Sequence, residues 1–163
     1  MANPISHSDQ PVQDCQQYLS QVTEDIAGRF HPTSPVGPLL SARSDAVDNV
    51  LNHLWQFYLD RRCDLALAAV GGYGRGELYP FSDIDLLILV KDSPNEDTAT
   101  QISELLRNLW DMGLKVGSSV RTLEECETLA REDLTIFTSL LEARHIAGST
   151  ELFSQLSAHI DQA

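Results

Sequence analysis

The sequence contains little positive charge. Two lysines, Lys91 and Lys115, and nine arginines stand against 24 Asp and Glu in 163 residues, which gives a formal net charge of −13. A protein that holds a long nucleic acid usually presents a basic face. The charge therefore argues against a nucleic-acid partner. Any negatively charged ligand must be small or must arrive with its own cations.

Long apolar runs and clustered cysteines are also missing. No stretch approaches the about 20 apolar residues of a membrane helix, and the N-terminus, with Asp9 and Asp14, has no apolar signal-peptide core. We therefore expect no membrane partner and a cytoplasmic location. The three cysteines, Cys15, Cys63 and Cys126, are far apart and form no CxxC pair. We expect buried free thiols rather than metal ligands.

The length and a hydrophobic fraction of 42% indicate one folded domain with a real core. Apolar residues at helical spacing predict helices over 11–28 and 41–59, joined by a stiff linker with Pro32, Pro35 and Pro38. We expect residues 1–40 to form an N-terminal helix and a partly flexible linker, and residues 41–163 to form the main domain.

The middle of the chain predicts a small sheet. Short apolar runs indicate three strands, over 65–70, 84–90 and 114–120. Helical periodicity predicts further helices, over 97–112, from a capping box at Thr122 and Glu125, over 132–144 and over 150–160. The expected fold class is α+β, with a small sheet flanked by helices and helical segments at both ends.

Two carboxylates begin the second of these strands, in the run Ser82-Asp83-Ile84-Asp85-Leu86-Leu87. Side chains at i and i+2 of a strand point to the same face, with Cα atoms roughly 6.5 Å apart. Like charges placed side by side persist most easily when a divalent cation joins them, and carboxylate oxygens suit Mg²⁺. The alternative for a bare Asp-x-Asp is a solvated polar strand edge.

A glycine-rich turn precedes this carboxylate pair. Gly71 and Gly72 close the first strand and let backbone N–H groups approach a phosphate, while Arg75 and Ser82 follow within a few residues. A tight connection would explain the glycines alone. A phosphate pocket beside a metal pocket explains the glycines, the arginine, the serine and the carboxylates together.

This arrangement resembles the nucleotidyltransferase superfamily that includes DNA polymerase β. The superfamily pattern is G-S/G-x-x-R/G followed about ten residues later by D-x-D. Here Gly71-Gly72-Tyr73-Gly74-Arg75-Gly76 takes the first part and Asp83-Ile84-Asp85 the second. Gly72 replaces the frequent serine, so one hydroxyl contact to a triphosphate is missing. The resemblance implies a polymerase β-like fold with a small mixed sheet.

The resemblance is closer to one family, the bifunctional uridylyltransferase/uridylyl-removing enzymes that modify the PII signal protein. It covers residues 41–160 and includes the runs 68–78, 109–111, 119–126 and 141–144. Members of this family also carry HD phosphohydrolase and ACT domains. The 163 residues contain neither, so we expect the chain to correspond to the N-terminal transferase domain alone.

The family resemblance implies a reaction and roles for the site residues. UTP would donate UMP to a tyrosine hydroxyl of PII, with release of pyrophosphate. Asp83 and Asp85 would be catalytic and would hold two Mg²⁺ ions. The nucleotide phosphates would bind to Gly71, Gly72, Arg75 and Ser82. The acidic surface is compatible with this ligand, because the triphosphate comes as its magnesium complex.

The sequence departs from the superfamily in one respect. Many members carry a third carboxylate on the strand at 114–120, which here has none. The nearest acids are Asp111 and Glu124, and each is as well explained as a helix-end residue. Arg121 could contact nucleotide or form a surface ion pair. The general base therefore stays unassigned. The histidines His53, His145 and His159 offer no better candidate.

Two alternatives to PII uridylylation remain open. A transferase of the same fold could use another acceptor, such as another protein, a small molecule or an aminoglycoside. A non-catalytic nucleotide sensor could have kept the pocket and lost turnover, which the missing third carboxylate would favour.

Overall fold

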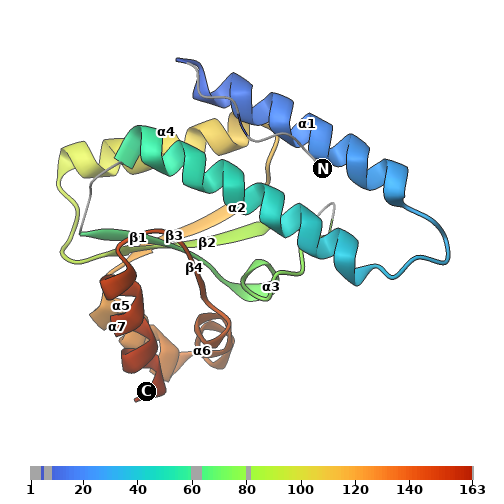
Figure 1. Cartoon of the computed structure of the whole chain (residues 1–163). Helices are drawn as coiled ribbons and strands as arrows, with labels where there is room; N and C mark the ends of the chain where they lie inside the picture. Colours follow the sequence, from blue (N-terminus) through green and yellow to red (C-terminus); the bar gives the residue numbers. More distant parts are fainter. Residues whose placement is uncertain (1–4, 6–8, 60–63, 80–81, 163) are drawn as a thin grey trace.

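A computed structural model of the chain describes residues 5, 9–59, 64–79 and 82–162, which form a small sheet with helices on both faces (Figure 1). The helices are α1 (Pro11–Arg29), α2 (Gly37–Leu59), α3 (Gly71–Gly74), α4 (Glu96–Asp111), α5 (Leu123–Glu132), α6 (Leu134–Leu141) and α7 (Thr150–Asp161). The strands are β1 (Leu65–Ala69), β2 (Ile84–Val90), β3 (Val116–Arg121) and β4 (Arg144–Gly148). This architecture confirms the predicted α+β class.

The sheet is mixed, as the resemblance implied, with strand order β3-β2-β1-β4. The central strand β1 pairs antiparallel with β2 and β4, and β2 pairs parallel with β3. A parallel pair needs a crossover connection, which α4 supplies between β2 and β3. The register of this parallel pair sets Asp85 opposite Gly117.

Helices α1, α2 and α4 cover one face of the sheet, and α5, α6 and α7 cover the other (Figure 1). Alternate residues of β2 divide between two apolar clusters. Ile84, Leu86, Ile88 and Val90 pack with α1, α2 and α4, while Leu87 and Leu89 pack with α5, α6 and α7. Because side chains alternate along a strand, Asp85 shares a face with Leu87 and is the one exposed position of β2.

The N-terminal helix joins the main core. Cys15, Tyr18 and Val22 of α1 belong to the same apolar cluster as α2 and the sheet, and the Asn49 amide donates a hydrogen bond to the Tyr18 hydroxyl at 2.9 Å. Helix α2 begins at Gly37 rather than at the predicted residue 41. Pro38 does not prevent this start, because the first turn of a helix needs no backbone N–H donor.

Residues 132–148 differ from the prediction. The sequence predicts one helix over 132–144, but the structure has α6 over Leu134–Leu141 and then a fourth strand, β4. Asp133 ends α5 and caps α6, where its carboxylate accepts hydrogen bonds from the backbone N–H of Thr135 and Ile136. Strand β4 is short and has a weak local pattern, so only its pairing with β1 makes it a strand.

Two predicted strands and one predicted helix cap are confirmed. The strand over 84–90 is correct, and the strand predicted at 114–120 is β3 at 116–121. The Thr122 side chain caps α5 by accepting a hydrogen bond from the backbone N–H of Glu125 at 3.2 Å.

Two cysteines are buried free thiols, as predicted. Burial raises the pKa of Cys15 to about 12 and that of Cys126 to about 11, so both stay protonated at neutral pH. The third, Cys63, lies outside the described residues. In the part of the chain that the structure describes, no helix has both the length and the apolar character needed to cross a bilayer.

Candidate nucleotidyltransferase site

The glycine-rich turn connects the end of β1 to the region before β2. Its one-turn helix α3 begins at Gly71, whose φ of +62° is in the region that favours glycine. The backbone N–H of Gly74 donates to the Val70 carbonyl at 3.1 Å, and that of Arg75 donates to the Gly71 carbonyl at 3.1 Å. Val70 in turn donates to the Asp85 carbonyl at 3.0 Å, which holds the turn directly beside β2.

Two glycines flank the Asp85 carboxylate. A Cβ at Gly71 would lie 3.2 Å from Asp85 Oδ2, and a Cβ at Gly117 would lie 3.1 Å from Asp85 Oδ1. Both distances are tighter than ordinary contacts, so a side chain at either position would press on the carboxylate. The glycines therefore leave both oxygens of Asp85 accessible to a ligand.

Asp83 and Asp85 form a pair of like charges at the start of β2. Both side chains are exposed, while Ile84 between them is buried. The pKa of the Asp85 carboxyl is raised, first by partial burial and then by the negative charge of Asp83. The ionised pair is thus unfavourable by itself, and a bound cation would relieve the repulsion.

A cavity of about 430 Å³ opens beside Asp85. It lies between the sheet and α6, and its lining residues are Val70, Asp85, Leu86, Leu87, Gly117, Ser118, Ser119, Arg121, Thr135, Ile136, Ser139 and Leu140. Polar groups from β3 and α6 thus share one space with the carboxylate of β2. The α6 residues Thr135 and Ser139 had no signal in the sequence, because only the folded chain brings them to β2.

Two further residues, Ser82 and Arg75, are predicted to bind phosphate. Ser82 directly precedes Asp83 and is half-buried. Arg75 is exposed and forms ion pairs with Glu142 at 2.7 Å and with Glu77 at 3.4 Å. The arginine therefore points to carboxylates of its own chain, and a phosphate would have to compete with Glu142 for it.

None of the candidate third carboxylates or histidines lines the cavity. Asp111 ends α4 and Glu124 lies in the first turn of α5, both exposed. His145 Nε2 lies 3.1 Å from the Gly148 carbonyl oxygen, and His159 pairs with Glu127 at 2.8 Å. The general base is not identified among these residues.

The donor set fits a hard divalent cation that is only partly coordinated by protein. Among the described residues, no group of three or more His, Cys, Asp and Glu side chains is placed to hold a metal ion. Asp83 and Asp85 can supply one or two carboxylates, and Mg²⁺ commonly takes its other ligands from water and substrate phosphates. The accessible oxygens of Asp85, between Gly71 and Gly117, are consistent with that mode of binding.

Residues 48–141, from within α2 to the end of α6, match the family model of the nucleotidyltransferase domain. The chain belongs to the nucleotidyltransferase domain family. The mixed sheet and its flanking helices are consistent with a nucleotidyltransferase fold, and the family generally uses divalent metals.

Curated relatives match most of this nucleotidyltransferase domain. The bifunctional uridylyltransferase/uridylyl-removing enzyme of Vibrio cholerae is 44% identical over 146 residues, which are 89% of this chain and 17% of that enzyme. The enzyme of the same name from Cupriavidus pinatubonensis is 49% identical over 127 residues, or 78% of this chain and 14% of the relative. That from Aliivibrio fischeri is 41% identical over 161 residues, or 97% and 18%. The chain spans about a sixth of these enzymes and matches their N-terminal domain, as the sequence predicted.

Proposed function

We propose that this domain transfers UMP from UTP to a tyrosine hydroxyl of the PII signal protein and releases pyrophosphate. The observation that carries the proposal is the position of Asp85, next to Asp83 at the start of β2, between a glycine turn and an open cavity. Nucleotidyl transfer needs a place for phosphates beside a place for metal. The chain is also 40–49% identical to enzymes named uridylyltransferase.

The carboxylate pair would hold the cations of the reaction. Asp83 and Asp85 offer oxygen ligands only, which favours Mg²⁺, and two ions are expected. When bound, these ions neutralise charge on the triphosphate and lower the pKa of the attacking hydroxyl. Asp85 is well suited to a cation because its charge is destabilised without one.

The glycine turn would hold the β- and γ-phosphates. Gly71 and Gly72 would donate backbone hydrogen bonds, and the Ser82 hydroxyl would add another. Arg75 would exchange Glu142 for a phosphate oxygen, an exchange helped by the exposure of the Arg75 side chain, which is 47% accessible. These contacts would orient the pyrophosphate leaving group for in-line displacement.

The cavity beside Asp85 would hold the nucleoside. Its mixed lining suits a nucleoside, because Ile136 and Leu140 offer apolar contact while Thr135, Ser139 and Arg121 offer hydrogen bonds. With the α-phosphate at Asp85, the tyrosine oxygen would bond to the α-phosphorus as the bond to pyrophosphate breaks. The tyrosine proton would pass to solvent.

The deciding experiment is a transfer assay with α-³²P-labelled UTP, Mg²⁺ and purified PII. We expect label on a PII tyrosine, with weaker or no transfer from ATP, CTP or GTP. Label on a different acceptor in place of PII would replace the proposed acceptor. The same transfer from every nucleotide would contradict the choice of UTP.

One observation favours a nucleotide sensor as the second candidate. Gly117 stands opposite Asp85 in the register, and β3 carries no carboxylate. A sensor would bind UTP in calorimetry and give no labelled product with any acceptor. UTP binding without transfer would therefore favour the sensor over the transferase.

A substitution in the cavity tests where the nucleoside binds. Ser139 of α6 lines the cavity, and Ser139→Leu would fill part of it. We expect the dissociation constant for Mg·UTP to rise about tenfold, or about 1.4 kcal/mol, in isothermal calorimetry. Thr138→Leu, on the adjacent exposed position of the same helix, is the control and should bind like the original chain. Equal affinities for the two variants would rule out this cavity.

A further inference from the structure

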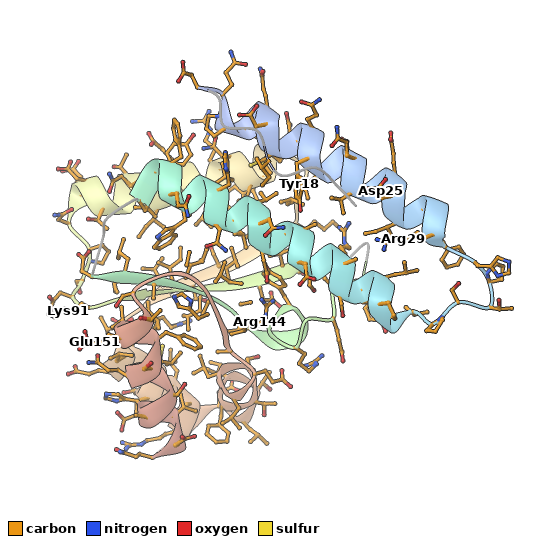
Figure 2. All side chains as sticks on the ribbon, viewed as in Figure 1. Tyr18, Asp25, Arg29, Lys91, Arg144 and Glu151 are labelled. Atoms are coloured by element: carbon orange, nitrogen blue, oxygen red, sulfur yellow. The ribbon has the colours of Figure 1, made fainter. Side chains whose placement is uncertain are left out.

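Arg144 connects three separate parts of the fold. It is the first residue of β4, and its guanidinium donates hydrogen bonds to the Tyr73 carbonyl at 3.0 Å and to the Gly74 carbonyl at 3.4 Å. Both carbonyls belong to the glycine turn, and Figure 2 labels Arg144 beside α3. The guanidinium carbon also lies 5.2 Å from the centre of the Tyr73 ring.

Asp48 of α2 holds the other side of this arginine. Its Oδ2 forms an ion pair with Arg144 Nη1, and its Oδ1 accepts a hydrogen bond from the Tyr73 hydroxyl. Burial and the charge of Asp48 raise the pKa of Tyr73, so the hydroxyl stays a donor. The side chains of Arg144 and Asp48 are 33% and 21% exposed, and partial burial strengthens a charged hydrogen bond.

The chain segment before Arg144 packs against the same turn. The Glu142 carbonyl lies so near Gly74 that a Cβ there would be 2.3 Å from its oxygen. The turn is therefore enclosed between β1, the Glu142 backbone and the guanidinium of Arg144. Its orientation depends on β4 and α2, which lie far from it in sequence.

We propose that Arg144, anchored by Asp48, is a positioning residue that fixes the Gly71–Gly74 turn and so sets its affinity for a triphosphate. The proposal rests on the proposed function, because it assumes that Gly71 and Gly72 bind phosphates. Arg144 touches carbonyl groups of the turn, so it acts on the ligand only through the backbone. Without the hydrogen bonds from the Arg144 guanidinium, the turn could tilt, and its N–H groups would no longer point at the phosphates.

The test uses Arg144→Lys in the full chain. Lysine keeps the charge and can pair with Asp48, but it lacks the planar fork that also reaches two carbonyls. The probes are inorganic tripolyphosphate and UTP, each with Mg²⁺ in calorimetry. We expect both dissociation constants to rise about tenfold. Amide hydrogen exchange should quicken in a peptide over 70–77, with the melting temperature within about 3 °C.

Two further variants make the test specific. Asp48→Asn should weaken tripolyphosphate binding in the same way, and combining it with Arg144→Lys should add little, because the two residues act as a unit. Arg131→Lys is the matched control, since Arg131 forms an exposed ion pair with Glu127 on α5. It should change neither binding nor exchange over 70–77.

The outcomes separate the two proposals. Unchanged tripolyphosphate binding and unchanged exchange in Arg144→Lys would overturn the positioning role and leave the proposed function standing. An original chain that binds neither UTP nor tripolyphosphate would overturn the proposed function and the affinity effect together. If Arg144→Lys does not fold, Tyr73→Phe takes its place in the same binding and exchange measurements. This variant removes only the hydroxyl bonded to Asp48.

Discussion

Asp85→Asn is expected to reduce UMP transfer about a thousandfold, or about 4 kcal/mol in activation free energy. Asparagine has the size of aspartate, so it fits between Gly71 and Gly117, but it lacks the negative charge that a divalent cation needs. The measurement is single-turnover transfer from labelled UTP at saturating Mg²⁺. Asp92→Asn, an exposed position just after β2, is the control and should keep full activity.

The same variant should not weaken the fold. In the folded chain the pKa of Asp85 is raised by partial burial and by Asp83, so its ionised form is destabilised. That penalty is present at pH values above the raised pKa and absent below the ordinary value. Asp85→Asn should therefore melt at the same temperature or higher than the original chain at pH 7.5. The gain should disappear near pH 4. A variant that melts lower at neutral pH, or that transfers UMP normally, would contradict this account of the site.

Gly148→Ala is expected to lower the melting temperature by about 10 °C. Gly148 has a φ of +81°, and a Cβ there would lie 2.5 Å from the Leu65 carbonyl oxygen and 2.9 Å from Trp55 Cζ2. The backbone conformation costs an alanine roughly 1–2 kcal/mol, and the overlap adds about 1–3 kcal/mol. At about 2–4 °C for each kcal/mol, thermal denaturation followed by circular dichroism would resolve the loss.

Gly28→Ala is the control for this substitution. Gly28 lies in the exposed last part of α1, and a Cβ there would meet nothing within 4 Å. Alanine is the better helix former by about 1 kcal/mol, so this variant should melt slightly higher. Equal melting temperatures for Gly148→Ala and the original chain would mean that β4 can move away from β1 at little cost.

The sequence was sufficient to predict the elements whose pattern is local. In β2, apolar residues alternate around Asp85 and then continue through Val90, and a period of two defines both the strand and the face of its carboxylates. The glycine turn was recognisable because Gly71 and Gly72 follow a buried run. These patterns involve only residues that are neighbours in the sequence, so they can be recognised without knowledge of the fold.

Features made by distant residues were not predictable. The residues of β4 become a strand only by pairing with β1, and Thr135 and Ser139 reach the cavity only because α6 packs under the sheet. Phosphate binding by Arg75 stays a prediction. No neighbouring residue in the sequence indicates its ion pair with Glu142. The partners of Arg144 include Asp48, 96 residues earlier, Tyr73, 71 residues earlier, and Gly74, 70 residues earlier.

The position of β1 in the middle of the sheet has a consequence for the order of folding. Its partner β2 follows within about 20 residues, but its other partner arrives much later, since Ala69 pairs with Arg144. Closing the larger loop costs more chain entropy, so the β1–β2 pair should form first and β4 should join late. Until β4 has joined the sheet, the glycine turn lacks its hydrogen bonds from Arg144. During synthesis the carboxylate strand would thus be in place before Arg144, which follows Gly74 by 70 residues, can hold the turn beside it.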